Sequence, residues 1–311
     1  MINKEPKPKG EAWQAYRTKE KRIGGSDTPA ILGFSKYKSA YTLWCEKTGK
    51  IIPEDISDKE AVRLGNDLED YVAKRFAEAT GKKVQNSNFI WTNTDYPWAH
   101  ANLDRVVVGE KAILECKTTD SWEIAKACQE GNYPPAWYSQ MTHYMMVTGF
   151  EKAYLGVLCF GKGFYWFTLE RNEEEIKALA EAEKDFWKLV ETNTPPAADG
   201  SDSSIDSLKV IYADRRPDQV DLTPYGSSLE MYMALKEQKK QIDAQLGAIQ
   251  AEVMQYMGNA STGTYGKYKV TWSDSSRKTF DKKAFEMAHG TIPDAFYKES
   301  TVTKFEIRKG K

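Results

Sequence analysis

The sequence contains few of the residues that bind soft metals or form disulfide frameworks. It has 4 cysteines and 3 histidines among 311 residues. The cysteines are scattered, with no CxxC pair, at Cys45, Cys116, Cys128 and Cys159. Zinc and iron–sulfur sites depend on close cysteine and histidine spacings. The pattern therefore argues against both kinds of site and indicates four reduced thiols.

Long hydrophobic runs are also missing. No apolar stretch reaches the ~18 residues that a membrane-spanning helix requires. The opening segment, MINKEPKPKG, is polar and does not resemble a signal peptide. We therefore expect a cytoplasmic protein with no membrane contact. We also expect residues 1–10 to form a loose arm rich in Pro and Lys.

An excess of charge of one sign is absent too. The chain carries 44 Lys and Arg against 45 Asp and Glu, a net charge of −1, so its composition does not indicate a nucleic-acid-binding protein. Residues 1–22 nevertheless carry seven Lys or Arg and three Glu. A local basic surface is enough to meet DNA phosphates in a protein that is neutral overall.

The hydrophobic residues that are present, 41% of the chain, suffice for a core. Their spacing, with glycines at several ends, predicts helices at 27–32, 39–48, 59–80, 134–148 and from residue 173 onward. Strand-like runs lie at 88–92, 101–108, 111–117, 152–160 and 164–170. Helices around a small sheet indicate an α/β or α+β core.

The composition changes near residue 195. Residues 192–204 are rich in Pro, Ser and Thr, as linkers are, so we expect a first domain over 1–195 and an extension over 196–311. A long helix at 227–257 carries apolar residues at alternating three- and four-residue steps, which is typical of a coiled-coil seam. Strands of the extension are expected at 208–212, 264–272 and 301–308.

The most informative segment is ANLDRVVVGEKAILECKTTD, which has the pattern of a β-hairpin. Gly109-Glu110 fits a two-residue turn with glycine first. With that turn, Asp104 lies directly opposite Glu115. Because side chains alternate along a strand, Lys117 projects from the same face as Glu115.

Two carboxylates that face each other repel unless a partner compensates them. Mg²⁺ takes one or two carboxylates and completes its shell with water and substrate phosphate. Lys117 beside the pair could position an attacking water or offset charge on a phosphate. On these residues alone, a surface ion cluster with no catalytic role explains the pattern equally well.

The segment near residue 26 could bind an anion. Ser26 follows Gly24-Gly25 and is expected to cap a short helix, whose unpaired N–H groups could receive a phosphate. Simple capping is the alternative. Arg22 and Arg17 are candidate phosphate clamps, although most arginines are solvated surface charges.

Two further polar residues lie on predicted helices. Glu69 can lean toward the interior, because it lies beside Leu68 on the partly apolar face; an ordinary boundary glutamate is the alternative. Gln140 lies on a partly apolar face of its helix and could be satisfied by nearby backbone instead. His100 and His143 lack metal-ligand spacing, and we expect both to be structural.

Asp104 followed by Glu115-Cys116-Lys117 resembles the signature of the PD-(D/E)xK nucleases. The flanking segments are similar, more narrowly, to the YqaJ-type viral recombinases of the phage lambda exonuclease family. The similar segments are RIGGSDTPAILGFSKYKSAYTLWCEKTG at 22–49, RLGNDLEDYVAKRFAEATG at 63–81, with the family's glutamate, and PPAWYSQMTHYMMVTG at 134–149, with its glutamine. Four motifs in this order are far more specific than Glu-x-Lys alone.

The resemblance implies an α/β, restriction-endonuclease-like core of the PD-(D/E)xK type. A central mixed sheet would be flanked by helices, and a helical-plus-strand extension would follow. Asp104, Glu115 and Glu69 would bind Mg²⁺, which Mn²⁺ is expected to replace. Lys117 would serve the attacking water, and Gln140 would help to hold the site.

The resemblance also implies that Ser26, Arg22 and Arg17 receive the 5′-phosphate of DNA. Two positions depart from the family pattern. Leu103 stands where the motif name has proline, which is frequent in the superfamily. Thr142 stands where members often have a second glutamine, which leaves that glutamine's role open.

The implied activity is 5′-to-3′ digestion of linear double-stranded DNA, leaving 3′ single-stranded tails for phage-type homologous recombination. The implied partners are double-stranded DNA ends, a RecT-type single-strand annealing protein and further copies of the chain in a trimeric ring. The setting would be the cytoplasm of a bacterial host, with the gene carried by a phage or prophage. One alternative is a restriction or repair endonuclease of the same superfamily, against which a 5′-phosphate pocket argues. The other is a non-catalytic DNA-binding or scaffold protein, against which the intact Asp–Glu–Lys set argues.

Overall fold

The computed structural model of the chain describes residues 1–8, 10, 12, 15–16, 21–298, 302–308 and 310. The chain forms two compact units, Met1–Asp214 and Arg215–Lys311, and each is described by itself. Within the described residues, no helix combines the length and apolar character needed to span a bilayer.

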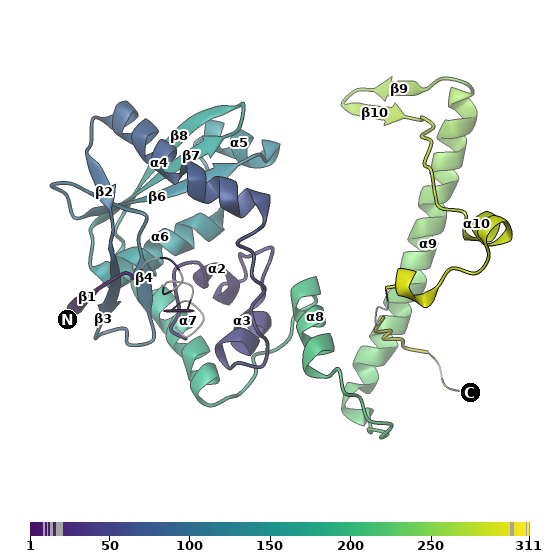
Figure 1. Cartoon of the computed structure of the whole chain (residues 1–311), viewed down its shortest axis with the longest axis horizontal. Coiled ribbons are helices and arrows are strands. Elements are labelled where there is room, and N and C mark those ends of the chain that lie inside the picture. Colours follow the sequence, from purple (N-terminus) through teal and green to yellow (C-terminus); the bar gives the residue numbers. More distant parts are fainter. Residues whose placement is uncertain are drawn as a thin grey trace. The chain divides into compact units, whose positions relative to one another are not determined.

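The first unit is built around a mixed sheet (Figure 1). In the described residues its strands follow the order β2 (Val84–Asn86), β5 (Arg105–Val107), β6 (Ala112–Thr119), β7 (Lys152–Cys159) and β8 (Gly163–Glu170). β6 and β7 are parallel, and the other neighbours are antiparallel. A parallel pair needs a crossover connection, which α5 (Trp122–Gln129) and α6 (Pro135–Thr148) provide. The expected central mixed sheet is confirmed.

Helices cover both faces of this sheet. Side chains alternate along β6, so Ile113 and Leu114 point to opposite faces. Ile113 shares a core cluster with Met141 of α6, whereas Leu114 shares one with Phe76 of α4 (Glu60–Thr80). α4 and α6 therefore pack on opposite faces of the sheet.

Most helix boundaries follow their sequence signals. α4 ends at Gly81 with φ +71°, and α6 ends at Gly149 with φ +67°, a left-handed backbone that glycine adopts without strain. The confirmed elements also include α3 (Ala40–Lys47), α7 (Glu173–Glu191) and the β7–β8 hairpin. The helix predicted at 27–32 is shorter, α2 (Thr28–Ile31).

A second sheet in the described part of the chain joins β1 (Ile2–Pro6), β3 (Phe89–Asn93) and β4 (His100–Asn102). The prediction of a loose N-terminal arm is wrong for β1, because this strand pairs with β3 along its whole length. The single strand predicted at 101–108 is split, since β4 pairs with β3 while β5 pairs with β2 and β6. Asp104 lies where the chain changes from one sheet to the other.

Helix α8 (Asp202–Ile211) replaces the strand predicted at 208–212. Thr42 of α3 donates its hydroxyl proton to the Ser203 carbonyl at 2.9 Å, and Ser39 donates its backbone N–H to the Ser203 hydroxyl at 3.1 Å. Leu208 packs beside the core cluster that includes α3. These contacts hold α8 to the first unit, which continues to Asp214.

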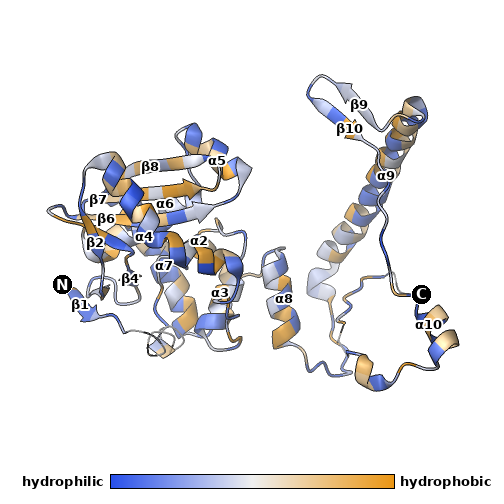
Figure 2. Ribbon diagram, turned by 45° about the horizontal axis from the view of Figure 1, so that its top comes forward, coloured by the Kyte–Doolittle hydropathy of each residue, from blue (hydrophilic) through white to orange (hydrophobic). Residues whose placement is uncertain are grey.

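In the second unit, α9 (Gly226–Met257) confirms the long helix predicted at 227–257. Hydrophobic residues alternate with hydrophilic ones along it (Figure 2). The predicted seam residues are 55–59% exposed at Leu235, Ile242, Leu246 and Ile249. This side of α9 is available for packing.

The rest of the second unit differs from its prediction. The strand predicted at 264–272 is a hairpin of β9 (Thr262–Tyr265) and β10 (Tyr268–Thr271), because Gly266 turns the chain with φ +55°. Residues 302–308, all described, form no strand. The remaining helical elements are α10 (Lys282–His289) and the short 3₁₀ turns η1 (Thr223–Tyr225) and η2 (Asp294–Phe296).

We expect a chain truncated after Asp214 to be more stable than one truncated after residue 195. The longer chain keeps α8 and its bonds to Ser39 and Thr42, and each hydrogen bond contributes ~0.5–1.5 kcal/mol. Thermal unfolding of the two chains should show a higher Tm for the longer one, by roughly 2–4 °C per kcal/mol. Equal Tm values would mean that the domain ends near residue 195.

Candidate active site

The β5–β6 hairpin has the register that its turn predicted. Arg105 lies opposite Leu114, so Asp104 and Glu115 are the next residues along the two strands. Asp104 Oδ2 accepts a hydrogen bond of 2.9 Å from the backbone N–H of Cys116. The two carboxylates therefore come from neighbouring strands to one end of the hairpin.

Glu115, Lys117 and Gln140 form a closed triangle of hydrogen bonds. Lys117 Nζ donates to Glu115 Oε1 at 2.7 Å and to Gln140 Oε1 at 3.0 Å. Gln140 Nε2 donates to the same Glu115 oxygen at 2.7 Å. Glu115 and Lys117 share the face of β6 that α6 covers, which brings Gln140 to them.

The other oxygen of Glu115 is buried without a protein partner. The residue is 2% exposed, and Oε2 has no hydrogen-bond partner among the described residues. An unpaired buried carboxylate oxygen is costly. Because carboxylate oxygens are ligands that hard divalent cations prefer, Glu115 and Asp104 fit a Mg²⁺ ion.

This site supplies a partial set of metal ligands rather than a cage. In the part of the chain that the structure describes, no three His, Cys, Asp or Glu side chains form a cluster able to hold a metal ion. Mg²⁺ usually keeps several waters and binds through one or two carboxylates plus substrate phosphate. The residues present fit that mode of binding.

Burial and mutual charge shift the titration of these groups. Burial, and then the charge of Glu115, raises the pKa of Asp104 to about 7. Burial lowers the pKa of Lys117, but the charges of Glu115 and Asp104 outweigh it and leave that pKa above its usual value. Lys117 is therefore a cation at neutral pH, and a bound cation would favour the charged form of Asp104.

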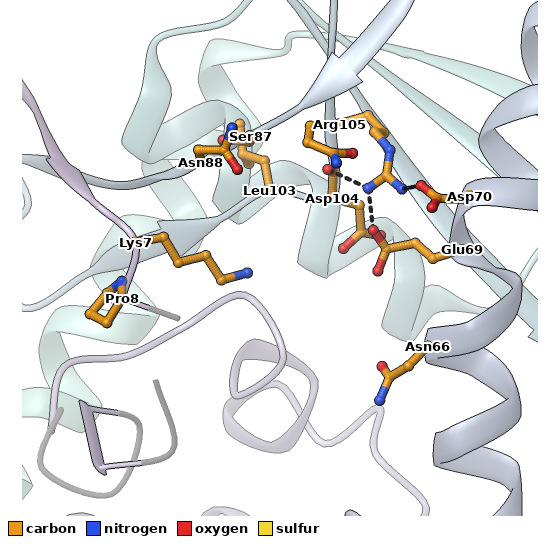
Figure 3. A pocket seen from close by; sticks show the side chains of 11 residues that line it. Lys7, Pro8, Asn66, Glu69, Asp70, Ser87, Asn88, Leu103, Asp104 and Arg105 are labelled. Carbon is orange, nitrogen blue, oxygen red and sulfur yellow. Dashed lines mark hydrogen bonds and ion pairs between the residues drawn. The ribbon is translucent and has the colours of Figure 1, made fainter. Parts of the chain in front are cut away.

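Glu69 of α4 points toward Asp104 and is paired with Arg105 (Figure 3). The buried Arg105 guanidinium also pairs with Asp70 and donates to the Asp104 carbonyl at 2.8 Å. Burial, and then the charge of Asp104, raises the pKa of Glu69, while Arg105 opposes the shift. Arg105 was not identified from the sequence; its place directly after Asp104 was the available signal.

A pocket of about 340 Å³ opens beside Asp104 and Glu69 (Figure 3). Asn66 of α4, Asn88 of the loop between β2 and β3, and Lys7 after β1 lie along its wall. A wall of amide and charged groups suits a polar ligand such as a nucleotide strand.

Gln140 is positioned by Tyr144, one turn further along α6. Gln140 Nε2 donates to the Tyr144 hydroxyl at 2.8 Å, and the tyrosine is buried. Thr142, where the family pattern often has glutamine, donates its hydroxyl proton to the Tyr138 carbonyl at 3.0 Å. Tyr144 was not identified as a site residue from the sequence, although its four-residue spacing from Gln140 was a usable signal.

The predicted cap at Ser26 is wrong. Asp27 occupies the cap position of α2, and its carboxylate accepts a hydrogen bond of 3.0 Å from the Gly24 N–H. Lys47 Nζ lies 2.7 Å from the Asp27 carboxylate, an ion pair that Ser26 could not form. Ser26 is exposed in the turn that precedes α2.

Arg22 lies near this turn. Its carbonyl accepts a hydrogen bond of 2.8 Å from Lys47, the same residue that pairs with Asp27, and its guanidinium donates to the Tyr16 hydroxyl at 3.2 Å. Arg17 lies outside the described residues.

His143 has the structural role that was expected of it. Its Nδ1 lies 2.7 Å from Glu183 Oε1, and its Nε2 lies 2.9 Å from the His100 carbonyl. Both nitrogens face acceptors, so the ring carries both protons. Burial lowers the pKa of His143, but Glu183 outweighs it and raises the pKa above its usual value.

Comparison with known proteins adds a family to this geometry. Residues 12–151, which include every candidate site residue, match the family model described as the YqaJ-like viral recombinase domain. The uncharacterized protein YqaJ of Bacillus subtilis (strain 168) is 35% identical over 296 residues, covering 94% of this chain and 92% of the relative.

Solved structures show the fold. LHK-Exo in complex with dAMP matches 66% of this chain and 98% of its own chain, with 19% identity and a TM-score of 0.50. The alkaline exonuclease LHK-Exo from Laribacter hongkongensis matches 60% of this chain and 94% of its own chain, with 19% identity and a TM-score of 0.49. The likeness of the first agrees with the PD-(D/E)xK fold that the sequence implied.

We expect Asp104→Asn to stabilise the protein when divalent metal is absent. Because the pKa of Asp104 is raised to about 7 in the folded state, its contribution to stability is complete below about pH 4 and is lost as the pH rises through 7. The amide removes the charge that Glu115 repels.

Thermal unfolding in a metal chelator should therefore give the variant a higher Tm than the original chain at pH 8. The difference should disappear below about pH 3, where Asp104 is protonated in both the folded and unfolded chains. Equal Tm values at pH 8 would contradict the repulsion between Asp104 and Glu115.

Proposed function

Because the chain belongs to the YqaJ-like viral recombinase domain family, we propose that it is a Mg²⁺-dependent exonuclease acting on linear double-stranded DNA from 5′ to 3′. The family, and the fold it shares with LHK-Exo, support a DNA exonuclease role. The observation that carries the proposal is the buried Glu115 carboxylate. One of its oxygens is held by Lys117 and Gln140, and the other has no partner in the described chain.

Asp104 and Glu115 would hold the metal ion, with Glu69 as a supporting carboxylate. When bound, Mg²⁺ lowers the pKa of a coordinated water and offsets charge on the scissile phosphate. Arg105 limits the negative charge at this end of the hairpin, because it pairs with Glu69. It also fixes the backbone of Asp104 through the carbonyl.

Lys117 would hold the attacking water. Its ammonium group is fixed by two acceptors, Glu115 and Gln140, so little freedom is left to lose when substrate binds. A lysine in this place can also offset charge that develops on the phosphate. Gln140 acts on both partners at once, because its amide contacts Glu115 and Lys117.

Digestion from a 5′ end requires a group that receives that end. We assign Ser26 and Arg22, with Arg17, to the 5′-phosphate on the family resemblance. Gly25, which precedes Ser26, packs against Tyr144, and Tyr144 is hydrogen-bonded to Gln140. These contacts bring the turn close to the candidate active site, which supports the assignment. LHK-Exo has been solved with dAMP, and we propose mononucleotides as the products here.

Removal of nucleotides from 5′ ends leaves 3′ single-stranded tails. Such tails are the substrate of a RecT-type annealing protein, which we propose as the partner in phage-type recombination. By the same resemblance the chain assembles as a trimeric ring, Mn²⁺ replaces Mg²⁺, and the reaction takes place in the bacterial cytoplasm.

Linear duplex DNA should be degraded in Mg²⁺, while covalently closed circles of the same sequence should persist. The reason is that a nuclease that must seat a 5′ end has no entry point on a closed circle. A gel assay with both substrates, with and without a chelator, measures this directly, and a label at the 5′ end should be released before a label at the 3′ end. Cleavage of closed circles at a comparable rate would favour the endonuclease alternative, and cleavage of neither would favour the non-catalytic one.

A further inference from the structure

The turn formed by residues 24–28 packs closely against Tyr144 of α6 and His100 of β4. A Cβ atom on Gly25 would lie 2.4 Å from Cε1 of Tyr144, and one on Gly24 would lie 3.2 Å from Cε1 of His100. The backbone of the turn therefore rests directly on the Tyr144 ring. A shift of the turn toward α6 has to move this ring.

The Tyr144 hydroxyl helps to hold the Gln140 amide in place. Gln140 Nε2 has two protons, of which one is donated to Glu115 and the other to Tyr144. Its Oε1 is then left to accept from Lys117. The reversed amide would face the carboxylate with its oxygen and the ammonium with its protons, so Glu115 and Lys117 select this orientation. The Tyr144 hydroxyl, which can donate or accept, adds a third contact that anchors the amide.

A second set of contacts ties the same turn to the same helix. Thr28 donates its hydroxyl proton to Glu183 Oε1 at 3.0 Å, and that oxygen lies 2.7 Å from His143 Nδ1. Thr28, His143 and Glu183 are each 0% exposed. His143 precedes Tyr144 in α6, so the turn is held to adjacent residues of one helix.

We propose that Tyr144 is a positioning residue through which a DNA 5′-phosphate seated on the 24–28 turn sets the position of Gln140 against the Glu115–Lys117 pair. The inference rests on the proposed function, because it assumes that the turn receives the 5′ end. A seated phosphate holds the turn against the ring, and the tyrosine holds the amide in contact with Glu115 and Lys117. A 5′-phosphate then raises the rate of hydrolysis as well as the affinity for the DNA end.

The test is Tyr144→Phe, which removes the hydroxyl and keeps the ring on which Gly25 packs. Initial rates on linear duplexes with 5′-phosphate and 5′-hydroxyl ends give kcat and KM for each end. In the original chain the phosphate should raise kcat and lower KM. In the variant the advantage in kcat should be lost, by about tenfold for one hydrogen bond of ordinary strength, while the advantage in KM remains.

Tyr165→Phe is the matched control. The Tyr165 hydroxyl donates to the Lys162 carbonyl at 3.1 Å in the β7–β8 turn, so the control loses the same atom and a hydrogen bond away from Gln140. It should lower the Tm without changing the ratio of kcat values between the two ends. A purely structural role for Tyr144 would give the same result as this control.

Gly25→Ala tests the same coupling at the turn instead of at the tyrosine. If Tyr144→Phe fails to fold, Gly25→Ala still tests the proposal. The added methyl displaces the ring while the hydroxyl remains, so the kcat advantage should again be lost; Gly200→Ala, at a position with open space, should keep it. If Tyr144→Phe or Gly25→Ala retains the full kcat advantage, the coupling is overturned and the proposed function stands. If the original chain shows no preference for 5′-phosphate in kcat or KM, the 5′-end assignment falls and the coupling falls with it.

Discussion

The Glu115 carboxylate is buried on β6, and its Oε1 atom accepts hydrogen bonds from Lys117 and Gln140. A buried charge is tolerated where an opposite charge and hydrogen bonds compensate it. The ammonium comes from the same face of the same strand, and the amide comes from the helix that crosses from β6 to β7. The parallel β6–β7 pair, its helical crossover and the alternation of side chains along β6 therefore combine to hold one carboxylate oxygen. The other oxygen is left without a partner among the described residues.

The second carboxylate depends on a break in the chain rather than on a regular strand. Asp104 lies where the backbone leaves the β1–β3–β4 sheet and enters the central one. Arg105 secures this junction, because it binds the Asp104 carbonyl and Glu69 together. α4 and α6 thus act from opposite faces of the sheet. α4 supplies Glu69, which pairs with Arg105 of β5 on the Asp104 side, and α6 supplies Gln140 on the Glu115 side.

Local signals predicted the parts of the site that lie close together in the sequence. The register of Asp104 and Glu115 followed from one glycine turn and the alternation of a strand, and helix ends followed from glycines. Contacts between distant segments left weaker traces. β1 has too few apolar residues to be identified as a strand until its partner β3 is known. The start of α8 was predicted as a linker and its end as a strand, because its partners, Ser39 and Thr42, lie far away in the chain. Ser26 and Asp27 are both common capping residues, but Asp27, which occupies the cap position, makes no side-chain cap bond and pairs with the distant Lys47 instead.

In the proposed mechanism, two residues of the hairpin have separate roles: Glu115 holds the metal ion and Lys117 serves the attacking water. Titration calorimetry with Mg²⁺ or Mn²⁺, run beside a nuclease assay on Glu115→Gln and Lys117→Ala, tests this division directly. Glu115→Gln should lose both metal binding and cleavage. Lys117→Ala should keep or tighten metal binding, because a nearby positive charge disfavours a cation, while its turnover falls ~10²–10⁴-fold. Full activity in either variant, or equal loss of metal binding in both, would contradict the account.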